Sequence, residues 1–122
     1  MPGLPAEMLR RLYQPGSLRD RNDGFELVLT NPLAPGTIIG VGPILIDDNE
    51  FPPAQITVLA GRSERPAPRI DERAPVQFAI NGQVRLQVAA ARLAPGPHRL
   101  VIHLHLREVG AVRIEVEDTL EG

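Results

Sequence analysis

Short runs of alternating apolar residues, separated by proline and glycine, constrain the fold of this 122-residue chain more than any other feature. Between Phe25 and Val116, several runs carry an apolar side chain at every second position. That period gives a β-strand one apolar face. The 13 prolines and 11 glycines lie mainly between the runs. The pattern therefore predicts an all-β chain of about seven or eight short strands joined by tight turns.

A strand with one apolar face must cover that face with another sheet. We expect a two-sheet antiparallel β-sandwich of immunoglobulin-like or fibronectin-like shape, with a partly closed barrel as the alternative. The length suits a single domain over residues 1–122. Within it we expect an N-terminal arm at 1–20, a long loop at 61–75 and a frayed tail at 118–122.

Individual segments differ in how clearly they specify a strand. Residues 25–30 follow the turn sequence Asn22-Asp23-Gly24 and alternate cleanly, which predicts a strand. Residues 37–46 contain Gly40, Gly42 and Pro43, so we expect either two short strands or one strand with a bulge. The arm is ambiguous between a short helix over residues 5–13 and an edge strand over 12–18.

Two hairpins are predicted in the second half. Residues 76–80 and 84–88 alternate on either side of Asn81-Gly82, a dipeptide typical of type I′ hairpin turns. The second hairpin joins residues 98–106 to 112–116, closing through Arg107 to Gly110.

Composition excludes several classes of protein. A formal charge of −2 and a pI near 5.9 speak against a nucleic-acid-binding protein. There is no cysteine, which excludes disulfides, thiolate metal sites and cysteine nucleophiles. No apolar run approaches the ~20 residues needed to span a bilayer. No basic and then apolar leader precedes residue 7, so we expect a cytoplasmic protein with no membrane association.

His103 and His105 are the most prominent candidate site residues. They lie two apart on one predicted strand, so both side chains share a face. The expected hairpin would place Glu115 opposite His103 and Arg113 opposite His105. Two imidazoles and a carboxylate could hold a divalent metal, but the neighbouring Arg113 would repel it. We favour a solvent-exposed surface or a partner interface, and expect no metal in this chain.

Other polar residues have ordinary structural explanations. His98 should point to the opposite face from the histidine pair and be a half-exposed packing residue at a strand start. The acidic run from Asp47 to Glu50 lacks calcium-loop spacing. Arginine is enriched at interfaces, so the arginines of the long loop are interface candidates, with a solvated loop as the equal alternative: Arg62, Arg65, Arg69 and Arg73.

The chain is poor in catalytic side chains. Its only serines, Ser17 and Ser63, lie outside any nucleophile elbow. We predict no catalytic or cofactor-binding residues, and a binding or accessory role. Because edge strands of a sandwich invite pairing, a homo-oligomer is possible.

Several segments together resemble the small beta subunits of C-glycoside deglycosidases. These segments cover most of the chain and consist mainly of turn and strand residues: Leu12-Tyr13-Gln14-Pro15-Gly16-Ser17-Leu18-Arg19, Asp23-Gly24-Phe25-Glu26-Leu27, Asn31-Pro32-Leu33-Ala34-Pro35-Gly36-Thr37, Gly40-Val41-Gly42-Pro43, Phe51-Pro52-Pro53, Ile56-Thr57-Val58 and Leu93-Ala94-Pro95-Gly96-Pro97-His98.

The resemblance implies an accessory β-sandwich subunit of a carbohydrate-active carbon–carbon lyase. Its partner would be a sugar-isomerase-like TIM-barrel alpha subunit that holds a manganese-like divalent metal and most of the acid/base residues. No metal ligand is carried over to this chain. Two alternatives are a free-standing module that binds carbohydrate or protein, and a small metal enzyme using His103, His105 and Glu115.

Overall fold

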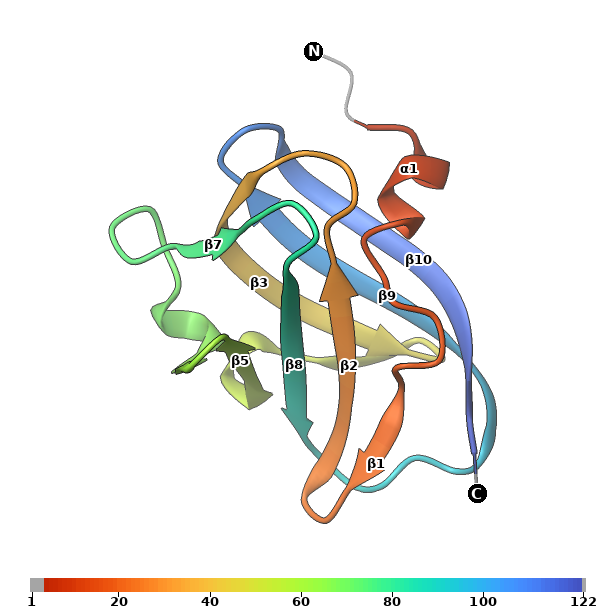
Figure 1. The fold of residues 1–122 in the computed structure, drawn as a ribbon. Helices are drawn as coiled ribbons and strands as arrows, with labels where there is room; N and C mark the ends of the chain where they lie inside the picture. The colour runs from red at the N-terminus through yellow and green to blue at the C-terminus, as the bar shows by residue number, and fades with distance from the viewer. Residues whose placement is uncertain (1–3, 122) are drawn as a thin grey trace.

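Two antiparallel sheets packed face to face form the protein, as the alternating pattern predicted (Figure 1). The structure is a computed structural model and describes residues 4–121. The first sheet has the spatial order β1 (Arg19–Arg21), β2 (Gly24–Thr30), β8 (Gln83–Ala89), β5 (Ile56–Ala60) and β6 (Ser63–Pro66). The second has the order β10 (Gly110–Leu120), β9 (Gly96–Leu106), β3 (Gly36–Ile46) and β4 (Asn49–Phe51), and β7 (Val76–Phe78) also pairs with β3. The expected β-sandwich is confirmed.

The core lies between the sheets and is built from the predicted alternate positions. Phe25, Leu27 and Leu29 of β2 are fully buried, as are Leu100 and Ile102 of β9. Their neighbours in sequence point outward and are more exposed, with a few exceptions. Burial of these apolar side chains is the main favourable contribution to folding, at roughly 1.5–3 kcal/mol for each large one.

The N-terminal arm is a short helix followed by turns, so the helix alternative holds in part and the edge strand predicted over 12–18 does not form. Helix α1 (Ala6–Arg10) packs against β10, and Tyr13 forms a single bridge with Leu29 of β2. The helix is shorter than the predicted 5–13. So short a helix is not stable without packing. Leu9 is buried and supplies this packing.

Strand β3 is one strand with a bulge, and its hairpin to β4 has a tight turn. The pairing of β3 with β9 shifts register between Ile38 and Gly40 and again between Val41 and Ile44. At the other end, Asp47 and Asp48 both have positive φ, at 50° and 71°. This is the combination that a two-residue type I′ turn requires.

The predicted hairpin at Asn81-Gly82 is wrong. Strand β7 pairs with β3 of the second sheet, whereas β8 pairs with β2 and β5 of the first. The chain crosses between the sheets at this turn. Asn31, at the end of β2, holds the crossing in place: its side-chain Nδ2 donates to Phe78 O at 2.7 Å, and its backbone carbonyl accepts from the Asn81 N–H at 2.6 Å.

The last hairpin is confirmed, but its register differs from the prediction by two residues. Leu106 pairs with Gly110, so the turn is tighter than expected, and Gly110 adopts a φ of 88°. Arg113 therefore lies opposite His103, and Ala111 lies opposite His105. Glu115 lies opposite Val101. The expected facing of Glu115 and His103 does not occur.

The predicted loop and tail are more ordered than expected. Residues 61–75 contain β6 and the 3-10 helix η2 (Ala67–Arg69), and Ala67 and Ile70 are buried. A second 3-10 helix, η1 (Pro53–Gln55), precedes β5. Instead of fraying at residue 118, β10 continues to Leu120, which is buried.

Candidate functional site

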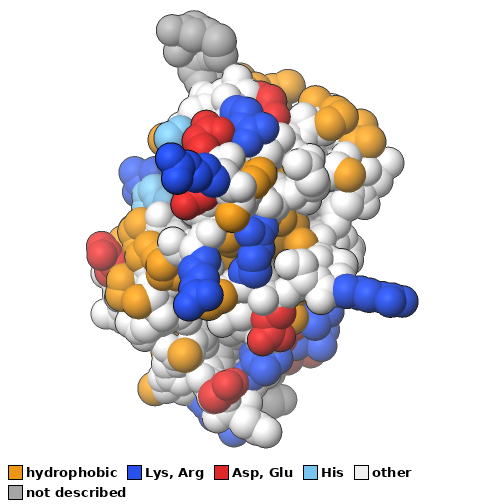
Figure 2. All heavy atoms as spheres, turned by 90° about the vertical axis from the view of Figure 1, so that its left-hand side faces the viewer, with side chains coloured by type: hydrophobic (Ala, Val, Ile, Leu, Met, Phe, Trp, Pro, Cys, Tyr) orange, Lys and Arg blue, Asp and Glu red, His pale blue; other side chains and the backbone are white. Residues whose placement is uncertain are grey.

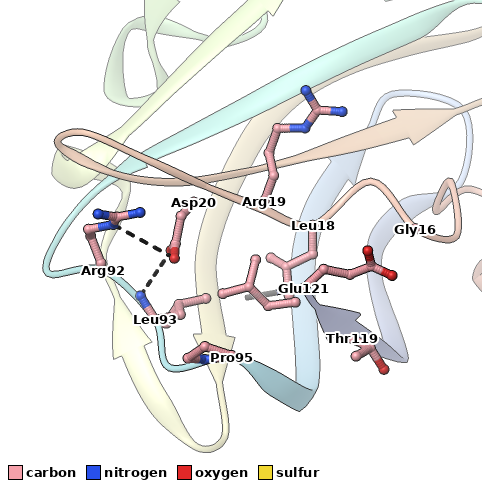
Figure 3. Close-up of a pocket in the computed structure, with 10 residues that line it drawn as sticks. Gly16, Leu18, Arg19, Asp20, Arg92, Leu93, Pro95, Thr119 and Glu121 are labelled. Atoms are coloured by element: carbon pink, nitrogen blue, oxygen red, sulfur yellow. Dashed lines mark hydrogen bonds and ion pairs between the residues drawn. The ribbon is translucent and has the colours of Figure 1, made fainter.

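A broad hollow lies where β1, the segment before β9 and the end of β10 meet (Figure 3). Its volume is about 840 Å³. Leu18 and Leu120 are buried beneath it, and Leu93 is half-buried at its side. Figure 3 shows the Leu18 and Leu93 side chains pointing toward the same space, while Arg19 extends away from them. We call this hollow the leucine groove.

Asp20 organises the polar side of the leucine groove. Its Oδ1 accepts from the Leu93 N–H at 3.1 Å, and its Oδ2 lies 3.8 Å from Nε of Arg92 (Figure 3). Besides Asp20 and Arg92, the charged lining residues are Arg19 and Glu121. Two arginines and two carboxylates leave the rim without a net charge. An apolar floor with a mixed rim is typical of contact with another polypeptide surface.

A second, smaller hollow is more apolar. It has a volume of about 240 Å³ and lies between α1 and the chain entering β3, with Met8, Leu33 and Val109 among its lining residues. At its edge, the Glu108 carboxylate accepts from both the backbone N–H and the hydroxyl of Thr37, at 2.9 and 2.8 Å. Desolvation opposes the charged form, but the bonds from Thr37 hold the pKa of Glu108 below its ordinary value.

His98 is buried, whereas a half-exposed packing residue was predicted, and both ring nitrogens are bonded. Nδ1 lies 2.6 Å from Asp47 Oδ2 and Nε2 lies 2.6 Å from Ala94 O. Since both partners can only accept, this bonding favours the imidazolium, in which both nitrogens donate. The Ala94 carbonyl, and then Asp47, raise the pKa of His98. The Arg99 N–H, and then His98, lower the pKa of Asp47.

Asp118 has a similar structural role at the N-terminal arm. Its Oδ2 accepts from the Tyr13 hydroxyl, from the Gly16 N–H at 3.0 Å and from the Leu18 N–H at 3.2 Å. Sequence reasoning missed this contact because its partners lie about a hundred residues away and no local motif marks it. The side chains of His98, Asp47 and Asp118 therefore hold connecting segments in place through their hydrogen bonds.

His103 and His105 share one face of β9 as predicted, and both line a groove of about 460 Å³ between the β3 bulge and η2. Figure 2 shows histidine surface at one margin of this side, next to arginine and acidic side chains and an apolar area. Glu115 lies on β10, two residues from Arg113, and pairs with its guanidinium at 3.6 Å instead of facing a histidine. Within residues 4–121, no group of three metal-binding side chains occurs.

The four arginines of residues 61–75 are not equivalent. Arg65 is half-buried and donates to Ala74 O and Pro75 O at 2.8 and 2.6 Å, so it ties the segment to itself. Arg62, Arg69 and Arg73 are exposed. Their assignment, and that of the histidine pair, to an interface stays a prediction.

Comparison with known families decides the chain's affiliation. Residues 8–121 match the family described as Hydroxymethylglutaryl-CoA reductase, N-terminal domain. The chain belongs to this family. The match runs from α1 to the end of β10, so it includes both sheets. A search of curated proteins gave no significant match.

Membership in the reductase N-terminal domain family overturns the resemblance to C-glycoside deglycosidase beta subunits. The accessory role in a carbon–carbon lyase and the TIM-barrel alpha partner are wrong with it, and the manganese-like metal was expected only in that partner. The free-standing binding module is not supported either. The quoted segments misled because they are turns and strand starts, such as residues 33–36 and 93–96, which enter β3 and β9.

The sequence predicted no membrane association. Within residues 4–121, no helix has the length and apolarity needed to cross a bilayer.

Proposed function

We propose that this chain serves a hydroxymethylglutaryl-CoA reductase as its N-terminal domain, where it provides a β-sandwich that contacts the rest of the enzyme and leaves the reduction to groups outside this domain. The observation that carries the proposal is the family match over residues 8–121. It covers the described elements from the middle of α1 through β10, so the resemblance is to a whole folded unit.

The bonding of the ionisable groups supports a structural role. His98 has no free nitrogen, because Asp47 and Ala94 occupy both. Asp118 and Glu108 accept from backbone and hydroxyl groups that anchor the arm and the start of β3. A general base must have a lone pair within reach of its substrate. The lone pairs and N–H groups of these side chains instead form hydrogen bonds within the fold.

The leucine groove is the surface we assign to contact with the catalytic part of the reductase. Leu93 offers a half-buried apolar side chain, and the rim offers both charges. The polyanionic end of a coenzyme A ester would favour a basic rim, whereas Asp20 and Glu121 oppose it. A polypeptide with its own mixed charges fits this groove better.

The test is a binding titration between this chain and the catalytic region of the reductase from the same organism. Calorimetry and size-exclusion chromatography at tens of micromolar should show a complex. Leu93→Asp should abolish it, because the new carboxylate would be desolvated in the contact. Ile80→Asp is the matched control, since Ile80 is 49% exposed and lies outside the groove.

Two results would contradict the proposal. One is the absence of a complex when both proteins are folded by circular dichroism. The other is a complex that Leu93→Asp and Ile80→Asp weaken equally, which would remove the leucine groove as the contact surface.

A further inference from the structure

The groove beside the β3 bulge presents two imidazoles from one strand. His103 and His105 are two residues apart on β9, so their Cα atoms lie about 7 Å apart and their side chains share a face. Both line the same groove. Opposite His105 the register places Gly40, where an added Cβ would lie 3.2 Å from the His105 Cβ. A larger residue there would crowd the imidazole.

A backbone carbonyl fixes the tautomer of His103. Its Nδ1 lies 2.9 Å from Pro43 O, and because a carbonyl only accepts, Nδ1 carries the proton. In the neutral ring, Nε2 then has a free lone pair. Within residues 4–121, Nε2 forms no hydrogen bond. Metal-binding histidines typically donate their other N–H to a carbonyl or carboxylate in this way. The bulge of β3 that brings Pro43 to this position is thus part of the site.

The geometry points to a divalent transition-metal site in which Nε2 of His103 and a ring nitrogen of the exposed His105 chelate one ion. Imidazole nitrogen suits copper, nickel and zinc, whereas magnesium and calcium prefer oxygen ligands. The chain supplies two ligands and water completes the coordination. Affinity should follow the general order of these metals, with Cu²⁺ binding more tightly than Ni²⁺ or Zn²⁺.

The charges around the pair modulate the affinity. Arg113 lies directly across from His103 and repels a cation. Its guanidinium lies 3.6 Å from the Glu115 carboxylate, and both side chains are more than half exposed, which weakens the repulsion. Removing the Arg113 charge should therefore tighten metal binding a few-fold, an effect that an unrelated surface substitution would not produce.

The test uses the untagged chain and CuCl₂ or ZnCl₂ as the ligand. Calorimetry should show one Cu²⁺ bound per chain. His103→Gln and His105→Gln should each weaken binding at least tenfold, and Arg113→Gln should strengthen it. The double variant His103→Gln/His105→Gln measures copper held elsewhere on the chain. His105 is exposed, so its substitution should leave the fold, monitored by circular dichroism, unchanged.

Histidine ¹⁵N chemical shifts give a readout independent of affinity. On adding Zn²⁺, the Nε2 resonance of His103 should move while Nδ1 stays protonated. Equal copper affinity in the wild-type chain and the double variant would overturn the site. Zinc bound at Nδ1 of His103 would overturn the assignment of the Pro43 carbonyl as the group that orients the ligand.

Discussion

Asp118→Ala should be one of the most destabilising substitutions at a partly exposed position. The carboxylate holds the arm against β10 through the Tyr13 hydroxyl and the Gly16 and Leu18 N–H groups. Tyr13 is only 3% exposed, and the Leu18 bond is also partly buried. Leaving each of these two donors without an acceptor costs about 1–3 kcal/mol. The Gly16 N–H is exposed and can bond to water. We expect a total loss of about 3 kcal/mol.

A double-mutant cycle separates this contact from general damage to the strand. Tyr13→Phe removes only the hydroxyl and should cost about 1.5 kcal/mol. Because both substitutions break the same bond, the pair should cost less than the sum of the two, with a coupling of about 1 kcal/mol. Burial, and then the Asp118 carboxylate, raise the pKa of Tyr13, so its hydroxyl stays protonated in a neutral assay.

The measurement is urea unfolding at pH 7 followed by far-ultraviolet circular dichroism, since the chain has no tryptophan. Glu117→Ala is the control, because Glu117 is exposed on the same strand and should change the free energy of unfolding by less than about 0.5 kcal/mol. If Asp118→Ala lies within that range, or if the two substitutions are simply additive, the anchoring of the arm by Asp118 is refuted.

Three further outcomes follow from other contacts. The pKa of His98 is raised above its ordinary value of 6.5, so the contact stabilises the fold below pH 6.5, and this stability is lost as the pH rises through the folded-state pKa. The pKa of Asp47 is lowered below its ordinary value of 3.8, so its contribution is present above pH 3.8 and is lost in acid. Thermal melts from pH 6 to 9 should therefore show a decline that His98→Gln makes shallower, and parallel curves would contradict this. Gly24→Ala should cost at least about 2 kcal/mol, because its φ is 151° and the new Cβ would lie 1.8 Å from Val88 O; a stable variant would show that the turn can move. Ile102→Ala should cost about 2–5 kcal/mol in the same urea assay because the side chain is fully buried, and a loss below 1 kcal/mol would mean that the core collapses around the cavity.

The sequence predicts the layers of this fold because the period-two pattern depends only on which residues face the core. Strands β8 and β10 follow it closely, whereas β2 and β9 also bury an intervening residue, Glu26 and Val101 respectively. Pairing is less predictable. Asn81-Gly82 resembles a hairpin turn, yet the chain crosses to the other sheet there. The Asn31 side-chain amide donates to Phe78 O, and the Asn31 backbone carbonyl accepts from the Asn81 N–H.

The candidate site could be predicted only in part, for a related reason. The shared face of His103 and His105 follows from their spacing. The bond between His103 and the Pro43 carbonyl does not, because it depends on the bulge in a neighbouring strand. The contacts of Asp118 join segments about a hundred residues apart, which no local pattern reports. The resemblance to another family was wrong because it rested on turn and strand-start residues, which report local backbone geometry and no site chemistry.

The reduction of hydroxymethylglutaryl-CoA, followed with a reduced nicotinamide cofactor, tests the central claim most directly. It compares this chain alone, the catalytic region of the reductase alone, and the two together. We expect no turnover by the chain alone, and a catalytic region that is active and resists thermal inactivation longer when the chain is present. Turnover by the purified chain alone, or a catalytic region whose activity and lifetime the chain leaves unchanged, would contradict the account.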